Sequence, residues 1–182
     1  MKMLPNMTVI CPADYEQTRQ ATLAIADYEG PVYLRFGRPK LPVFYKTDAP
    51  FEIGKAQKLI SGDDVTIIAT GYMVWEAIKA AQILKEKGIH ADVINMHTIK
   101  PLDTDAILES AARTGKVVTA EEHQRLGGLG GSVSQVLAEN NPTPMRMVSV
   151  DDSFGESGTP TQLMDKYGLN ADAIVTKTLE IL

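Results

Sequence analysis

The chain has 182 residues, of which 44% are hydrophobic and 23% charged, and its formal net charge is −5. This composition is typical of a soluble globular protein, and it argues against nucleic-acid binding, which needs clustered Lys and Arg. No apolar run approaches the ~20 residues that cross a bilayer, and the single Cys11 excludes an internal disulfide. We therefore expect a cytoplasmic protein that does not contact membranes.

Residues 1–36 are predicted to form one strand–helix–strand unit. The strands are expected at Thr8–Cys11 and Val32–Phe36, and the helix between them is capped by Asp14, with Gln17 completing a capping box. A unit of this length is below the roughly 40 residues at which small folds need disulfides or metals. We therefore expect it to be the end of a larger α/β domain.

Residues 37–50 are rich in proline, which removes backbone donors, so this stretch is predicted to be a stiff interdomain linker. Strands and helices then alternate over residues 51–182. We expect strands at 55–60, 65–69, 91–96, from 117 and at 145–150, and helices that begin near Met73, Asp103, Val133, Pro160 and Ala171. Gly88 and Gly115 are expected to end two of these helices. This order predicts a three-layer α/β/α domain with a mostly parallel sheet.

Residues 117–139 are predicted to form a strand, a glycine-rich turn and a helix, an arrangement that often binds ligands. The glycines of Gly127–Gly131 either let backbone N–H groups bind a phosphate or allow a sharp turn and close helix–sheet packing. The spacing matches neither common nucleotide-binding fingerprint. We favour the structural interpretation, in which Ser132 is a candidate helix cap.

The charged cluster Glu121, Glu122 and His123 follows the same strand. Adjacent carboxylates beside a histidine can serve as an acid–base pair. Successive strand residues point to opposite faces, however, so only Glu121 and His123 are expected to share a side. No second cluster in the sequence completes a metal site, and we favour a hydrogen-bonded turn or a polar interface.

Two further polar segments have several interpretations. Lys100 and Asp103 can pair, or Lys100 can face an anion, but we favour a role in shaping the strand-to-helix turn, with Asp103 as a helix cap. Residues 151–158 carry acidic residues without the spacing of an EF-hand loop. We expect a structured loop in which Phe154 is the anchor.

Arg35 and Arg38 flank Gly37 at the end of the second predicted strand. A guanidinium binds carboxylate or phosphate groups in a bidentate way. The alternative is an interdomain salt bridge, and for Arg38 the two interpretations carry similar weight.

The sequence resembles the C-terminal half of transketolase-type, thiamine-diphosphate-dependent enzymes. Nearly the whole chain takes part, and the order and spacing of the matching segments carry the resemblance. These segments are LPNMTVICPAD, GPVYLRFGRPKLP, FEIGKAQKL, DDVTIIATG, INMHTIKPLD, VVTAEEHQRLGGLGGSV and VDDSFGESG. Deoxyxylulose-phosphate synthases and the β subunits of 2-oxo-acid dehydrogenases are similar in outline.

The resemblance implies that residues 1–36 end a pyrimidine-binding domain and that residues 51–182 form a C-terminal domain for dimer and domain packing. It also implies that Arg38 contacts the phosphate of a sugar phosphate, with Arg35 as the alternative. The family's G-D-G…N motif and its activating Glu do not occur in this sequence. We therefore expect thiamine diphosphate and Mg²⁺ to belong to the complete enzyme, and this chain alone to hold neither.

The partner implied by the resemblance is an N-terminal, thiamine-diphosphate-binding portion or subunit, with a homodimer as the expected assembly. The complete enzyme would transfer a two-carbon ketol unit between sugar phosphates, and this chain alone would be inactive. Two other hypotheses remain open. One is a non-catalytic assembly domain that docks onto a separate catalytic subunit, and the other is a nucleotide-binding module that uses Gly127–Gly131.

Overall fold

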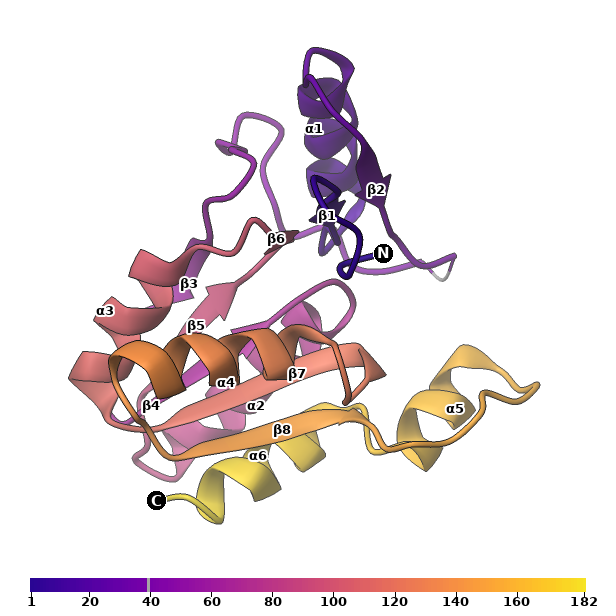
Figure 1. Cartoon of the computed structure of the whole chain (residues 1–182). Helices are drawn as coiled ribbons and strands as arrows, with labels where there is room; N and C mark the ends of the chain where they lie inside the picture. Colours follow the sequence, from indigo (N-terminus) through magenta and orange to yellow (C-terminus); the bar gives the residue numbers. More distant parts are fainter. Residues whose placement is uncertain (39) are drawn as a thin grey trace.

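A computed structural model describes residues 1–38 and 40–182, which form two sheets flanked by helices (Figure 1). The smaller sheet has the strand order β2-β1-β6. Its strands are β1 (Thr8–Ile10), β2 (Val32–Leu34) and β6 (Thr98–Lys100), and helix α1 (Tyr15–Ala26) joins β1 to β2. Strands β1 and β2 are parallel, as the strand–helix–strand prediction requires, but both are shorter than expected.

Strand β6 differs from the prediction, which places Lys100 in a strand-to-helix turn. It pairs antiparallel with β1, joining Val9 to Lys100 and Ile10 to Thr98. The segment that follows β5 of the larger sheet therefore supplies an edge strand to the sheet of residues 1–36. A three-residue strand whose partner lies almost ninety residues earlier leaves no periodic signal in the sequence.

The larger sheet has the strand order β3-β5-β4-β7-β8, and only β3 runs antiparallel to its neighbour. The strands are β3 (Gln57–Ile60), β4 (Val65–Ala69), β5 (Ala91–Asn95), β7 (Val117–Gln124) and β8 (Met145–Val150). The helices are α2 (Met73–Glu86), α3 (Thr104–Thr114), α4 (Leu129–Asn140), α5 (Pro160–Lys166) and α6 (Ala171–Leu179). Gly88 and Gly115 follow α2 and α3 with φ of 77° and 67°, which confirms them as helix terminators.

Two buried apolar clusters lie on opposite faces of this sheet. In β4, Ile67 packs with residues of α2 and α6, whereas Ile68 packs with residues of α3 and α4. Alternate strand residues point to opposite faces, so an apolar run such as 65–69 predicts a strand covered on both sides. Figure 1 shows α3 and α4 on one side of the sheet and α2 and α6 on the other, which confirms the three-layer fold.

Asp14 joins helix α1 to the proline-rich segment. Its Oδ1 accepts a hydrogen bond from Gln17 N at 2.8 Å, which confirms the predicted cap. The side-chain oxygen of Gln17 accepts from Ala13 N, one residue earlier than a capping box requires. Asp14 Oδ2 accepts from Phe44 N and Tyr45 N, both at 2.8 Å. One carboxylate therefore begins a helix and also fixes the segment that connects the two sheets.

The proline-rich segment forms neither helix nor strand in its described residues, 37–38 and 40–50, as predicted. Pro39, which the linker prediction includes, lies outside the described residues. Side chains of α1 bind the segment further on, because Arg19 and Gln20 donate to the Thr47 carbonyl at 3.1 and 3.2 Å. The segment is thus held along α1 by several hydrogen bonds.

A polar network joins the first unit, the proline-rich segment and the larger sheet. Asn95 Nδ2 donates to Gln17 Oε1 at 3.0 Å and to the Tyr45 hydroxyl at 2.9 Å. Gln17 Nε2 donates to Gln57 Oε1 at 2.6 Å. Burial raises the pKa of the Tyr45 hydroxyl to about 12, so this group stays protonated and can donate at neutral pH. The contact between the two sheets is therefore polar as well as apolar.

No helix in the described ranges, 1–38 and 40–182, is long and apolar enough to span a bilayer.

Replacing Asp14 by Ala is expected to lower the free energy of unfolding by about 2–3 kcal/mol, because it removes the cap of α1 and leaves the Phe44 and Tyr45 amides without their acceptor. Urea denaturation measures the change. The matched control is Asp48→Ala, an exposed aspartate of the same segment, which should change it by less than about 0.5 kcal/mol. Equal losses in the two variants would contradict the proposed role of Asp14.

The buried His97 is expected to make the stability of the protein depend on pH. Its ring is fully buried and stacks on Phe51 with centroids 4.4 Å apart, and burial lowers its pKa from 6.5 to about 4. Between these values the unfolded chain binds more protons than the folded one. The free energy of unfolding should therefore fall as pH drops from about 6.5 to about 4, by roughly 2–3 kcal/mol from this group.

Denaturant unfolding at several pH values tests this dependence. His97→Gln should lose this part of the slope, and the exposed His90→Gln should keep it. An unchanged slope in His97→Gln would assign the pH dependence to other groups.

Candidate functional site

Arg35, at the end of β2, connects the first unit to the larger sheet. Its backbone N donates to Ile10 O at 2.8 Å. Its Nη2 donates to the carbonyl of Glu122 in β7 at 2.9 Å and lies 3.9 Å from Glu122 Oε2. Its Nη1 lies 3.8 Å from the sulfur of Cys11. The guanidinium is thus engaged by groups of the protein itself, which matches the salt-bridge interpretation for this residue.

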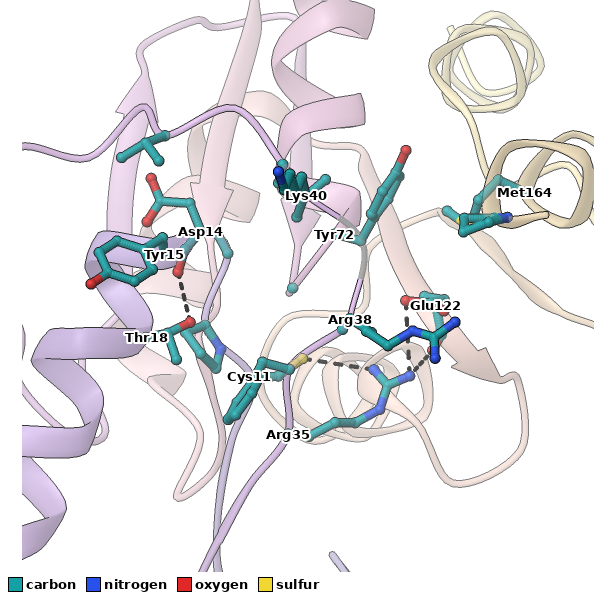
Figure 2. Close-up of a pocket in the computed structure, with 18 of the residues that line it drawn as sticks. Cys11, Asp14, Tyr15, Thr18, Arg35, Arg38, Lys40, Tyr72, Glu122 and Met164 are labelled. Carbon is teal, nitrogen blue, oxygen red and sulfur yellow. Dashed lines mark hydrogen bonds and ion pairs between the residues drawn. The ribbon is translucent and has the colours of Figure 1, made fainter.

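Arg38 lies three residues further on and is exposed. Its side chain lines a cavity of about 700 Å³, within the size range of small-molecule sites. Figure 2 shows the guanidinium groups of Arg35 and Arg38 close to Glu122. Both arginines line the cavity, but Arg35 also holds two parts of the fold together, whereas Arg38 is exposed.

The cavity has two sides from distant parts of the chain. Residues 11–15, 18, 35–38, 40, 41 and 43 form one side, and they include Asp14, Arg38 and Lys40. The other side comes from Tyr72, just before α2, and from Leu163 and Met164 of α5. Nothing in the sequence indicated Tyr72, Leu163 or Met164, since only the tertiary fold brings them to Arg38.

Glu121 is buried at the N-terminus of α4. Its carboxylate accepts from Leu129 N at 2.7 Å and from Gly130 N at 2.8 Å. Burial raises the pKa of this carboxyl, and the two backbone hydrogen bonds act in the opposite direction. A helix N-terminus favours anions, and here the chain's own carboxylate takes the place that a phosphate would occupy.

Three glycines of the turn, Gly127, Gly128 and Gly130, have the structural roles that the sequence analysis favoured. Gly127 has φ of 83°. A Cβ at Gly128 would collide with the Glu121 carboxylate, and one at Gly130 would come within 2.8 Å of the Met147 sulfur. Helix α4 begins at Leu129 rather than near Val133, so Ser132 lies inside the helix and the prediction of a Ser132 cap is wrong. This geometry argues against a nucleotide-binding turn.

The side chains of the charged cluster are distributed as strand geometry predicts. His123 Nδ1 lies 3.9 Å from Glu121 Oε2, on one side of β7. Glu122 faces the other side, toward Arg35. Glu121 serves the fold as the cap of α4, and Glu122 lines the cavity with Arg38.

Lys100 and Asp103 do not pair. Lys100 Nζ donates to the carbonyls of Lys2 and Leu4 at 3.2 and 2.6 Å. Asp103 accepts from Ala106 N with one oxygen and from Ala56 N with the other, which confirms it as the cap of α3. Asp103 therefore shapes the strand-to-helix turn, as the favoured interpretation predicted, whereas Lys100 instead binds the N-terminal segment.

The loop before α5 differs from the prediction in one respect. The Phe154 side chain is 98% exposed, so the expectation that it anchors the loop is wrong. The loop is held by polar groups instead, because the Tyr167 hydroxyl bonds to the Phe154 carbonyl at 3.2 Å and Glu156 pairs with Lys166 at 2.5 Å. Asp151 is likewise paired with Arg125 at 2.6 Å. Arg125 follows β7 and Lys166 belongs to α5, so these carboxylates bind the loop to neighbouring elements.

Two features of the described residues bear on a site for magnesium and a diphosphate. They contain no group of three or more His, Cys, Asp and Glu residues placed to hold a metal ion. Glu121 already caps α4, the helix that follows the glycine-rich turn. The cavity lining carries the cationic side chains Arg35, Arg38 and Lys40, the carboxylates Asp14 and Glu122, and a partly apolar side. The cations outnumber the carboxylates, and the cavity can hold an organic molecule with an anionic group.

Comparison with known proteins finds relatives over nearly the whole chain. Residues 54–174 match the family described as transketolase, C-terminal domain. The chain is 44% identical to a putative transketolase C-terminal section of Methanocaldococcus jannaschii, covering 99% of this chain and 57% of that protein. It is 47% identical to the 6-deoxy-6-sulfo-D-fructose transketolase subunit SqwH of a Clostridium species, covering 100% and 56%.

A solved structure agrees with these sequence relatives. It is described as a split gene transketolase, inactive beta4 tetramer, and it matches with a TM-score of 0.97 and 47% identity over 100% of this chain and 60% of that chain. The chain thus spans a little over half the length of the curated relatives it matches. Both the fold and the sequence lead to one conclusion: the chain belongs to the transketolase C-terminal domain family.

Proposed function

We propose that this chain is the C-terminal portion of a transketolase-like enzyme that transfers a two-carbon ketol unit between sugar phosphates. The observation that carries the proposal is an identity of 40–47% over 98% or more of the chain with relatives named as transketolase sections or subunits. In this proposal residues 1–36 complete a pyrimidine-binding domain and residues 51–182 form the C-terminal domain. Residues 37–50 are the linker between these two domains. A cytoplasmic location is part of the proposal, supported by the single buried thiol of Cys11.

The cofactor of the complete enzyme is proposed to be thiamine diphosphate with Mg²⁺, which supplies the electron sink that side chains lack. The described residues of this chain do not fit its diphosphate and metal. The proposal therefore assigns them to an N-terminal portion or separate subunit. Two relatives are named as transketolase subunits, which supports a separate partner. A homodimer of the complete assembly belongs to the same proposal.

Arg38 is the residue we assign to the substrate phosphate. It is exposed and faces the cavity, whereas the guanidinium of Arg35 is bound to Glu122 and lies beside Cys11. A guanidinium that is already hydrogen-bonded has less to offer a ligand. This difference supports Arg38 over Arg35 and gives Arg35 the role of holding β2 against β7.

Two alternatives have specific support. A 1-deoxy-D-xylulose-5-phosphate synthase of Desulforudis audaxviator is 36% identical over 96% of this chain, which keeps that reaction as a second candidate. The identity is lower than for the transketolase relatives. A non-catalytic assembly domain is the other alternative, favoured by the exposed side chains of Met3, Phe36 and Leu126. Activity with and without the thiamine-diphosphate-binding partner separates these possibilities.

In the complex with that partner, Arg38→Ala is expected to weaken the binding of phosphorylated substrates by about 1.5–3 kcal/mol, which is the scale of a charged hydrogen bond. The effect should appear mainly in KM, measured by steady-state kinetics, and should be absent for an unphosphorylated substrate. Arg146→Ala, an exposed arginine of β8 outside the cavity lining, is the matched control.

Arg35→Ala distinguishes the two arginines. Loss of its bond to the Glu122 carbonyl should lower the melting temperature, while Arg38→Ala should leave it unchanged. Unaltered kinetics of Arg38→Ala with phosphorylated donors and acceptors would contradict the assignment. If Arg35→Ala selectively lost activity with phosphorylated substrates and kept its melting temperature, the phosphate contact would be assigned to Arg35.

A further inference from the structure

The cavity that Arg38 lines has its opposite side in the C-terminal domain. Tyr72 precedes α2, and Leu163 and Met164 belong to α5, which lies more than 120 residues after Arg38. Figure 2 shows Arg38, Tyr72 and Met164 around one space, with Asp14 and Tyr15 further along on the side of the first unit. We call Tyr72, Leu163 and Met164 the far wall.

The far wall differs in chemistry from the side that carries Arg38. Arg38 and Lys40 bring positive charge, and Asp14 and Glu122 add carboxylates to the same lining, whereas Leu163 and Met164 are apolar. An anionic group is therefore attracted to the two cations and not to the apolar side chains. The far wall limits the space around that group by its shape and not by its charge.

The far wall is anchored to the core of the domain. Met164 is buried and belongs to the cluster between α2, α6 and the sheet. Its carbonyl accepts from Leu169 N at 2.8 Å, which fixes the end of α5. Leu163 is half-buried, and the Gly158 loop approaches it so closely that a Cβ at Gly158 would come within 3.0 Å of its side chain. Leu163 therefore occupies a defined place beside the cavity.

A wall at this position can limit the length of the sugar phosphate that the cavity accepts. In the proposed reaction the carbonyl end of every acceptor reacts at one place, so a longer acceptor carries its phosphate further from that place. The phosphate end is where Arg38 and the cavity lie, if the proposed function holds. When the space in a pocket changes by the volume of one methylene group, the ratio of kcat/KM for two substrates changes by roughly 10–200-fold.

We propose that Leu163 is a specificity-determining residue, which sets how long a sugar phosphate the enzyme accepts by limiting the cavity opposite Arg38. This proposal rests on the proposed function and goes beyond it, because it gives the C-terminal domain a direct part in choosing the substrate. Leu163 acts by its volume and takes no part in the chemistry.

The test uses the complex with the thiamine-diphosphate-binding partner and compares kcat/KM for a five-carbon and a three-carbon aldose phosphate as acceptors. Leu163→Phe narrows the cavity and should lower the five-carbon to three-carbon ratio about tenfold. Leu163→Ala widens it and should raise the ratio. Leu179→Phe, an exposed leucine of α6 outside the cavity lining, should leave the ratio unchanged.

The outcomes are distinct. Opposite shifts of the ratio in the two Leu163 variants, with unchanged melting temperatures, support the proposal. A ratio within twofold of the wild type in both variants, or equal losses for both acceptors, overturns it while the proposed function stands. If the wild-type complex transfers no ketol unit to either acceptor, the proposed function fails and this proposal fails with it.

Discussion

Carboxylates that cap helices and hold a second segment at the same time are the interaction on which the structure depends. The first N–H groups of a helix have no partner within the helix, and a carboxylate offers two oxygens to satisfy such donors. Asp14 uses one oxygen for α1 and the other for the Phe44 and Tyr45 amides. Asp103 divides its oxygens in the same way between α3 and Ala56. Each of these short side chains therefore determines where a helix begins and where a distant segment lies.

Two other helices receive their carboxylate from another element. Glu121 of β7 binds the first amides of α4, and Glu76 of α2 accepts from Ala171 N at the start of α6. These positions would otherwise attract external anions. Because the protein fills these two positions itself, they do not bind an external anion, and side-chain cations remain as anion-binding groups. Arg38 and Lys40, at the cavity between the first unit and α5, are placed for that task.

The sequence predicted the interactions that are local and not those that cross the fold. Asp14 and Asp103 were recognised as caps because a cap stands next to its helix, and the buried strands followed from their apolar runs. The second oxygen of Asp14 reaches a segment thirty residues away, for which no short pattern exists. Strand β6 was missed for the same reason, since its partner β1 lies in the first unit. Phe154 was assigned as an anchor because aromatic rings are usually buried, yet polar pairs hold that loop.

At the candidate site, too, the sequence indicated the local features and not the contacts that cross the fold. The residue pattern and the family resemblance led to Arg38, but they did not separate it from Arg35, which differs only in what it contacts across the fold. The far wall was invisible in the sequence for the same reason. Arg35 binds β7, Asp14 binds the connecting segment, and Met164 binds the core beneath α5. Both units therefore contribute side chains to the cavity that Arg38 and Leu163 line. A domain whose expected role was packing thus also shapes the cavity, because the contacts that attach it to the first unit are the ones that surround Arg38.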